Sequence, residues 1–242
     1  IRLIDPNGMS VEHPENGILY TGKDAEEVFK VLLALFGQTK TTEEKDEDQK
    51  KTGTAIIIGG ARDVGGFSNT IKEIIDGVSS NQNAAVQGFT SSPLKEGTEA
   101  FVKRIVDYII KNHIKGNKLV IYGYSYGAMI ALKVCRALNK LLEPIKVDLL
   151  ITIDPASGKN TDKLDRSVSN NVVINFNFWQ PRKDSYGSFG APNEPINDPR
   201  IKNIDFTKNT IPGWFGTSLV GHREMDEISF DFSINVINAY IK

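Results

Sequence analysis

The sequence predicts an α/β fold, with helices covering both faces of a mostly parallel sheet. From Thr54 onward, short apolar runs alternate with amphipathic stretches that have helical spacing. The apolar runs are continuous, as in strands that are buried on both faces. The composition agrees, because 40% of the 242 residues are hydrophobic and 24% are charged, which is ordinary for a globular protein and excludes a disordered or fibrous chain.

The expected elements alternate strand and helix along the chain. The expected strands cover 55–58, 84–89, 118–122, 147–153 and 172–178. The expected helices cover 67–76, 99–113, 128–139 and 224–241. This alternation is typical of parallel strands joined by crossover helices. Residues 180–221 are rich in Pro, Gly and Asn, so we expect mostly loop there, long enough to act as a cap or binding loop.

Charge and residue counts exclude several classes of protein. The 29 basic and 30 acidic residues give a net charge of -1, so there is no overall bias towards nucleic acid or anionic lipid. One cysteine, Cys135, excludes an intramolecular disulfide framework. The three histidines, His13, His113 and His222, argue against a structural zinc site. We therefore expect no metal ion and no organic cofactor.

The start of the chain is expected to lie outside this fold. Residues 23–36 have the apolar spacing of an amphipathic helix, whereas 39–53 contain no apolar residue and are expected to form a solvated linker. The predicted organisation is a tail over 1–22, a helix and charged linker over 23–53, and the α/β domain over 54–242.

The tail carries the string Leu3-Ile4-Asp5-Pro6-Asn7-Gly8-Met9, in which Pro and Gly are typical of a turn. An ordinary surface turn could use the same residues. The string also resembles the end of an Rhs/YD-repeat core, the shell that precedes a variable C-terminal domain in large bacterial proteins. This resemblance implies that the rest of the chain is secreted or delivered as cargo, as a toxin effector with a cognate immunity protein as its partner.

The third expected strand runs into Gly123-Tyr124-Ser125-Tyr126-Gly127, which has the form G-x-S-x-G. Between a strand and a helix, this motif makes a sharp turn that lifts the serine hydroxyl above the sheet edge. The glycines are needed because larger side chains would clash with the neighbouring strand and helix. The N–H of Tyr126 faces the same space, where the helix N-terminus favours an oxyanion. The alternative is an inert serine in a glycine-bounded turn.

On this motif, residues 54–242 resemble the α/β-hydrolase superfamily, and its lipase-like branch in particular. The resemblance implies a triad in the order Ser, acid, His, with Ser125 as the nucleophile. Asp154 directly follows the fourth expected strand, in a string, Ile153-Asp154-Pro155-Ala156, that resembles the LDPA of pancreatic-type lipases. In many other hydrolases the acid comes one strand later, which would favour Asp184 or Asp205. A capping role for Asp154 is a further alternative.

His222 is the expected base, because the family places its histidine in a late loop before the final helix. His13 lies in the tail, and His113 ends a surface helix, where a solvated or capping role fits better.

A second oxyanion donor is expected after the first strand, in Ile58-Gly59-Gly60-Ala61. We assign it to the backbone N–H of Ala61, with the neighbouring Arg62 as the competing choice. A phosphate-binding loop is the rival interpretation, but the segment has neither G-x-x-x-x-G-K-[ST] nor G-x-G-x-x-G.

Aromatic residues precede the expected base. Trp214 and Phe215 are predicted to form an acyl-chain wall or a mobile lid, and the alternative is that they close the core. The segment 173–180, VINFNFWQ, resembles the N-x-x-Q strand of bacterial lipase-like hydrolases and has no assigned role beyond shaping the site. Cys135 lies among apolar neighbours and is expected to serve packing.

These observations predict a serine hydrolase that acts on carboxylic esters, with a lipid or another ester as its substrate and no nucleic acid partner. No run reaches the roughly 18 apolar residues of a transmembrane segment, so we expect a soluble protein that makes at most transient contact with a membrane surface. An acyltransferase or thioesterase with the same triad stays open, as does an inactive hydrolase fold used as a binding module.

Overall fold

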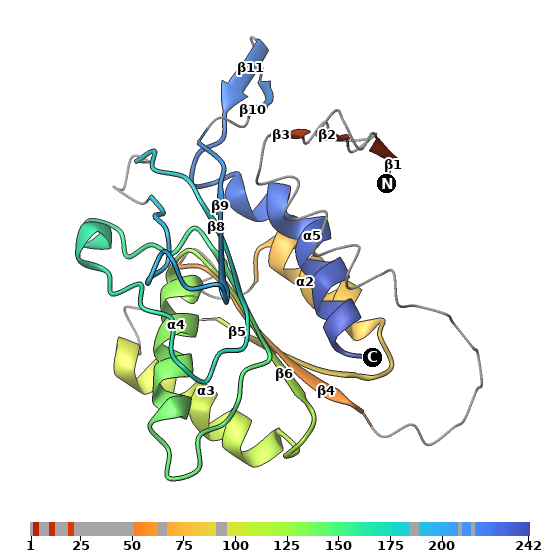
Figure 1. Ribbon diagram of the computed structural model, residues 1–242, viewed down its shortest axis with the longest axis vertical. Coiled ribbons are helices and arrows are strands. Elements are labelled where there is room, and N and C mark those ends of the chain that lie inside the picture. Colours follow the sequence, from red (N-terminus) through yellow and green to blue (C-terminus); the bar gives the residue numbers. More distant parts are fainter. Residues whose placement is uncertain are drawn as a thin grey trace.

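The computed structural model describes residues 51–61, 67–90, 96–183, 189–207 and 220–242, together with the backbone of short strands outside these ranges. Its centre is a six-stranded sheet in the order β5-β4-β6-β7-β8-β9 (Figure 1). All neighbouring pairs in this sheet run parallel. The strands are β4 (Gly53–Ile58), β5 (Ala84–Phe89), β6 (Lys118–Tyr124), β7 (Leu149–Ile153), β8 (Asn175–Trp179) and β9 (Ile201–Asp205).

Two pairs of helices cover the two faces of the sheet, as Figure 1 shows. One face carries α2 (Asn69–Ser79) and α5 (Met225–Tyr240), and the other carries α3 (Thr98–Asn112) and α4 (Tyr126–Asn139). The α2 helix begins where the Ser68 side chain accepts a hydrogen bond from the backbone of Ile71. The predicted α/β architecture, with helices on both faces of a parallel sheet, is confirmed.

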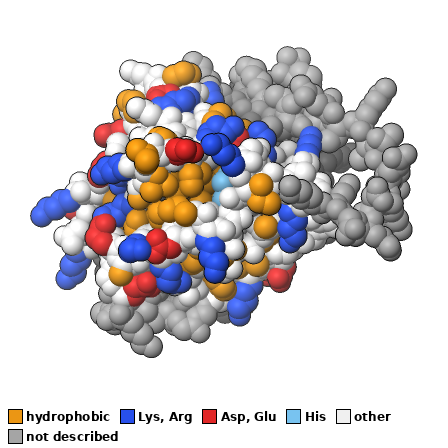
Figure 2. Space-filling model, turned by 90° about the horizontal axis from the view of Figure 1, so that it is seen from below, with side chains coloured by type: hydrophobic (Ala, Val, Ile, Leu, Met, Phe, Trp, Pro, Cys, Tyr) orange, Lys and Arg blue, Asp and Glu red, His pale blue; other side chains and the backbone are white. Residues whose placement is uncertain are grey.

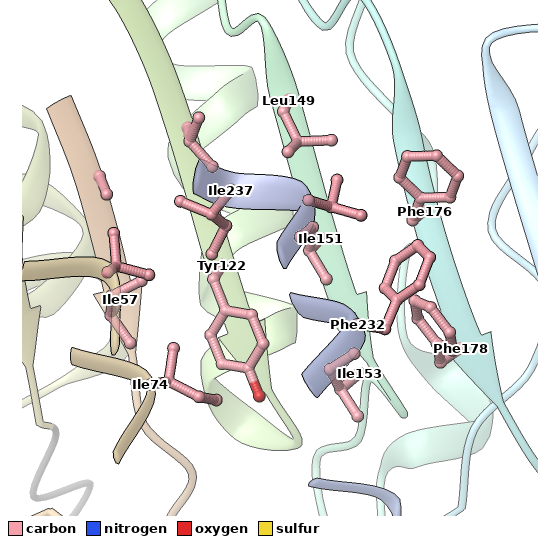
Figure 3. Close-up of a cluster of buried hydrophobic side chains, with 14 of the residues drawn as sticks. Ile57, Ile74, Tyr122, Leu149, Ile151, Ile153, Phe176, Phe178, Phe232 and Ile237 are labelled. Carbon is pink, nitrogen blue, oxygen red and sulfur yellow. The ribbon is translucent and has the colours of Figure 1, made fainter. Parts of the chain in front are cut away.

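Successive strand residues point to opposite faces and enter two separate cores. On the face of α2 and α5, Tyr122 and Ile151 belong to one buried cluster, in which Phe232 of α5 packs on Phe176 and Phe178 (Figure 3). On the other face, Ile121 and Leu150 join the side chains of α3 and α4. Both sets are buried, which explains why these strands read as continuous apolar runs in the sequence.

A polar network replaces a helix over β7, β8 and β9 on the face of α4. The Nδ2 of Asn193 donates to Thr152 Oγ1 and to Asn175 Oδ1, both at 2.9 Å. The Nδ2 of Asn177 donates to Asn203 Oδ1 at 2.8 Å. These amides hold the irregular segment around Asn193 on the sheet, because buried polar groups are stable only when they are paired.

Most predicted elements match the structure within a few residues, and β5 matches at both ends. Val147 forms an isolated bridge with Val172, so β7 begins later than predicted. Within residues 180–221, predicted as mostly loop, the structure has strands that the sequence does not indicate: β9, and a hairpin of β10 (Thr210–Gly213) and β11 (Gly216–Leu219). The segment of β9 reads Ile-Lys-Asn-Ile-Asp, which has too few apolar residues to indicate a strand.

Near the start of the chain, β1 (Arg2–Ile4), β2 (Ser10–Glu12) and β3 (Leu19–Thr21) form an antiparallel sheet that the sequence analysis did not predict. The predicted helix over 23–36 lies outside the described residues, as does most of the predicted linker. The division of the chain at residue 53 stays a prediction.

The surface opposite the carboxyl ends of the strands carries apolar side chains. Figure 2 shows this face, seen from below Figure 1, with a patch of hydrophobic side chains that has Lys and Arg at its margin. Ile110, Ile114 and Leu142 are among the exposed apolar residues, and they lie near the C-terminal ends of α3 and α4. Within the part of the chain that the structure describes, no helix is both long enough and apolar enough to cross a bilayer.

Candidate active site

Ser125 lies in the turn between β6 and α4, and its backbone has a positive φ of 56°. Its N–H donates to the carbonyl of Ile153 at 2.8 Å. The two glycines of the motif are required by space. A Cβ on Gly123 would lie 2.4 Å from the carbonyl oxygen of Gly127, and a Cβ on Gly127 would lie 2.4 Å from that of Gly59. The turn is therefore as tight as the sequence motif predicts.

The hydroxyl of Ser125 meets the imidazole of His222, with 2.8 Å between Oγ and Nε2. The other ring nitrogen, Nδ1, lies 2.6 Å from Oδ2 of Asp154. An ionised carboxylate only accepts hydrogen bonds, so Nδ1 carries the proton in this contact. In that tautomer Nε2 is an acceptor, and the Ser125 hydroxyl donates to it.

Asp154 follows β7 directly and is fully buried. Its backbone has a φ of 47°, and its N–H donates to the carbonyl of Phe178 at 2.7 Å. The carboxylate accepts two further hydrogen bonds from Gln180: the backbone N–H reaches Oδ1 at 2.9 Å and Nε2 reaches Oδ2 at 2.7 Å. Each oxygen therefore has a donor from the protein, which a buried carboxylate needs because it has no water around it.

The comparisons with known proteins add a likeness of fold. A search of family models found no match, and no curated protein matches in sequence. A protein from Agrobacterium vitis S4 that is assigned as a hydrolase has a similar structure, with a TM-score of 0.53 and 15% identity over 80% of this chain and 90% of that one. The chain has an α/β-hydrolase fold. The sequence-based resemblance to the superfamily agrees with this fold.

Other solved structures match at lower scores. A cutinase-like protein from Cryptococcus sp. has a TM-score of 0.43 and 11% identity, covering 79% of this chain and 96% of that one. The esterase domain of a Rhodothermus marinus protein has a TM-score of 0.42 and 13% identity, covering 66% of this chain and 78% of that one.

The other acids and histidines considered from the sequence lie elsewhere. Asp205 is exposed, and its carboxylate accepts the N–H of Thr207 at 2.7 Å. His113 is the C-terminal cap residue of α3, as its position in the sequence suggested, and burial lowers its pKa. Asp184 and His13 lie outside the described residues. Among the described residues, Asp154 is the carboxylate that meets the imidazole of His222.

Tyr124 holds His222 in place, a role that the sequence analysis did not assign. Its hydroxyl donates to the carbonyl oxygen of His222 at 2.9 Å, and its ring stacks on the imidazole with 5.6 Å between the ring centroids. On the other side, Glu224 accepts the N–H of Gly221 at 3.0 Å. The backbone on both sides of the imidazole is therefore tied down.

Both predicted oxyanion donors belong to segments next to Ser125. Tyr126 is the first residue of α4, where backbone N–H groups have no partner within the helix. Ala61 follows Gly60, at which an added Cβ would lie 3.5 Å from the Cβ of Ser125. The turn after β4 therefore passes beside the nucleophile candidate. Arg62, the competing choice for the second donor, lies outside the described residues.

Arg166 is a buried cation near Asp154 that the sequence analysis missed. Its Nη2 donates to the carbonyl of Pro155 at 3.1 Å and its Nη1 to that of Thr161 at 3.2 Å. Burial lowers the pKa of Arg166, and the negative charges of Asp154 and Glu194 oppose this. The guanidinium thus braces the loop that follows Asp154.

The residues predicted to bind substrate, Trp214 and Phe215, lie outside the described residues, between β10 and β11. Their role stays a prediction.

Proposed function

We propose that the protein is a serine hydrolase that cleaves carboxylic esters. The observation that carries this proposal is the continuous chain of hydrogen bonds from Ser125 through His222 to Asp154, with lengths of 2.8 Å and 2.6 Å. A serine hydroxyl alone is a poor nucleophile, and it becomes a good one when a base takes its proton and a carboxylate orients that base. The positive φ of Ser125 supports the proposal, because strained backbone is concentrated at functional sites.

In the proposed reaction, Oγ of Ser125 attacks the ester carbonyl carbon while Nε2 of His222 takes the hydroxyl proton. The carbonyl oxygen becomes negatively charged, and the backbone N–H groups of Tyr126 and Ala61 stabilise it. Collapse of this tetrahedral intermediate breaks the ester C–O bond, and the departing alcohol receives the proton from His222. Asp154 stays ionised throughout and stabilises the imidazolium.

The second half of the reaction releases the acid. Water attacks the acyl group on Ser125 while His222 takes a proton from that water. The C–O bond to Ser125 then breaks, and Oγ recovers its proton from His222. Every proton and electron pair in this cycle moves between the substrate, water and side chains of the chain itself.

The test is hydrolysis of p-nitrophenyl esters of increasing acyl length. Ser125→Ala should lose several orders of magnitude in kcat/KM, the scale seen when a triad nucleophile is removed. The matched control is Ser80→Ala, an exposed serine that caps α2 at its C-terminus. A fluorophosphonate probe should label the wild type but neither Ser125→Ala nor His222→Ala. A wild type that neither turns over esters nor reacts with the probe would overturn the proposal.

Product analysis and substrate preference distinguish an ester hydrolase from an acyltransferase or a thioesterase with the same triad. With an added alcohol or amine acceptor, an acyltransferase would form the acylated acceptor faster than the free acid. With thioesters, a thioesterase would show a higher kcat/KM than with oxygen esters of the same acyl group. An ester hydrolase should give free acid as the main product and favour the oxygen ester.

We further propose that the ester is a lipid, on the strength of the predicted acyl wall at Trp214 and Phe215. Replacing both by Ala should lower kcat/KM for long acyl chains more than for short ones. Equal losses at all chain lengths would contradict a lipid-binding role for these aromatic residues.

The string Leu3-Ile4-Asp5-Pro6-Asn7-Gly8-Met9 supports a proposal about context: the domain is the delivered effector of an Rhs-type bacterial protein, neutralised by a cognate immunity protein. Expression in bacterial cells should arrest growth for the wild type and not for Ser125→Ala. Equal growth of the two strains, whether the chain is directed to the periplasm or retained in the cytoplasm, would contradict an antibacterial role.

A further inference from the structure

Gln180 directly follows β8 and is fully buried. In the sheet, β8 pairs in parallel with β7, and Ile153 lies opposite Phe178. The residues that follow the two strands therefore meet at the same edge of the sheet. This register brings Gln180 against the carboxylate of Asp154, to which it donates from both its backbone and its side chain.

The side-chain amide of Gln180 is oriented by a second partner. Its Oε1 accepts the backbone N–H of Arg182 at 2.6 Å. A backbone N–H only donates, so the oxygen must lie on that side and Nε2 must face Asp154. The group against the carboxylate is therefore a donor that does not titrate, and it never competes with His222 for the role of acid or base.

Gly190 closes this arrangement from the other side. Its N–H donates to the carbonyl of Gln180 at 2.8 Å, and a Cβ at this position would lie 1.8 Å from Oδ1 of Asp154. The next residue, Ala191, is held by the Nδ2 of Asn177, which donates to its carbonyl at 3.0 Å. The Asp154 carboxylate is thus enclosed. Gln180 donates to both of its oxygens, and at Gly190 there is no space for a side chain.

We infer that Gln180 is a positioning residue: its two hydrogen bonds set the plane of the Asp154 carboxylate so that Oδ2 points at Nδ1 of His222. The inference rests on the proposed function, since the orientation matters for catalysis only if His222 is the base.

The test uses Gln180→Met, which keeps the length of the side chain and removes its donor, and Gln180→Glu, which puts a titratable group in its place. Gln87→Met is the matched control. It makes the same change on β5, where the side chain donates only to the neighbouring Gly88 carbonyl in the contacts described. Among the described residues, Asp154 faces the altered position directly, and His222 and the buried Arg166 lie near Asp154. Arg182 is bonded to Gln180 through its backbone.

Gln180→Met should lower kcat by about 10- to 100-fold, the effect of one hydrogen bond to a charged group, with KM little changed. The Asp154 carboxylate then loses the donor that fixes its plane, so it orients the imidazole of His222 less well. Gln180→Glu should show its largest deficit at high pH, where two carboxylates repel each other. That deficit should shrink as the pH falls and the new carboxyl group donates again.

A second measurement does not depend on turnover. The proton on Nδ1 of His222 should give a low-field NMR resonance, assigned by its loss in His222→Gln. This resonance should shift in both Gln180 variants and stay in place in Gln87→Met. If the wild type hydrolyses no ester but the resonance responds, the proposed function fails and the positioning role stands. An unchanged resonance in folded Gln180→Met or Gln180→Glu, with wild-type pH dependence, would overturn the inference.

Discussion

The hydroxyl of Tyr124 donates to the main-chain carbonyl of His222 over 2.9 Å, although 98 residues separate the two in the chain. Tyr124 immediately precedes Ser125, so the turn that presents the proposed nucleophile also grips the proposed base. The stacked rings of Tyr124 and His222 add a second contact at the same point. Tyr124 therefore fixes the position of His222 relative to Ser125.

Removing this hydroxyl should loosen the base. In Tyr124→Phe the ring stack is retained and one neutral hydrogen bond is lost, about 1 kcal/mol, so kcat/KM should fall about fivefold. In Tyr124→Ala, which also loses the ring stack, kcat/KM should fall further. Tyr108→Phe on α3, whose ring packs on Phe89, is the control. Wild-type activity in Tyr124→Phe would contradict a role for the hydroxyl.

The strained backbone of Ser125 predicts a gain in stability when the residue becomes glycine. A positive φ of 56° is unfavourable for residues with a side chain and costs glycine nothing. Both Ser125→Ala and Ser125→Gly should be inactive. The free energy of unfolding, measured with urea, should nevertheless be about 1 kcal/mol higher for the glycine variant than for the alanine variant. A lower value for Ser125→Gly would show that the turn is not strained.

Gly127 should tolerate no side chain. In Gly127→Ala the new Cβ would meet the backbone oxygens of Ile58 and Gly59 at 2.4 Å, and neither atom can move without displacing β4. We expect a loss of about 3 kcal/mol in the free energy of unfolding, the cost of severe overpacking. Gly97→Ala is the control, because a Cβ there has nothing within 4 Å. Equal melting temperatures of the two variants would argue against the close packing of the turn.

The buried carboxylate of Asp148 predicts a pH-dependent stability. Burial raises its pKa, but hydrogen bonds from Lys146, the N–H of Leu119 and Lys118 outweigh this and hold the pKa below its usual range. A folded-state pKa below the unfolded value of about 3.9 stabilises the protein above that pH. The stabilisation is lost as the pH falls through the folded-state pKa.

Asp148→Asn should therefore lower the free energy of unfolding at neutral pH by about 1–3 kcal/mol. The difference from the wild type should narrow progressively below about pH 4. Denaturant melts over a series of pH values measure this, with the exposed Asp76→Asn as the control. A difference that stays constant with pH would mean that the charge of Asp148 is not what stabilises the fold.

The sequence predicts the buried parts of the fold well, because burial on both faces leaves a continuous apolar signal. In β4, for example, every residue is buried, and the apolar run over 55–58 predicts the strand. The strand β9 escaped prediction because its polar residues enter the network of amides over β7 and β8. Asn203, for example, pairs with Asn177 and Asn193 and does not enter an apolar core.

The candidate site also has residues that the sequence predicts and contacts that it does not. The motif around Ser125 and the chain order of Asp154 and His222 predict residues that the structure brings into contact. The sequence shows a glutamine at the end of a strand, but it does not show which strand lies alongside. The contact of Gln180 with Asp154 depends on the pairing of β7 with β8 and on the positive φ of Asp154. These properties exist only in the assembled sheet.

The order of the site residues along the chain has a consequence for synthesis. A nascent chain that has left the ribosome as far as β9 already contains Ser125 and Asp154, but His222 and α5 are still to come. Until α5 arrives, the sheet also lacks one of the two helices that cover this face. The nucleophile therefore meets its base only after the segment beyond β9 has also left the ribosome. Fragments that end before His222 contain the proposed nucleophile and acid but lack the proposed base.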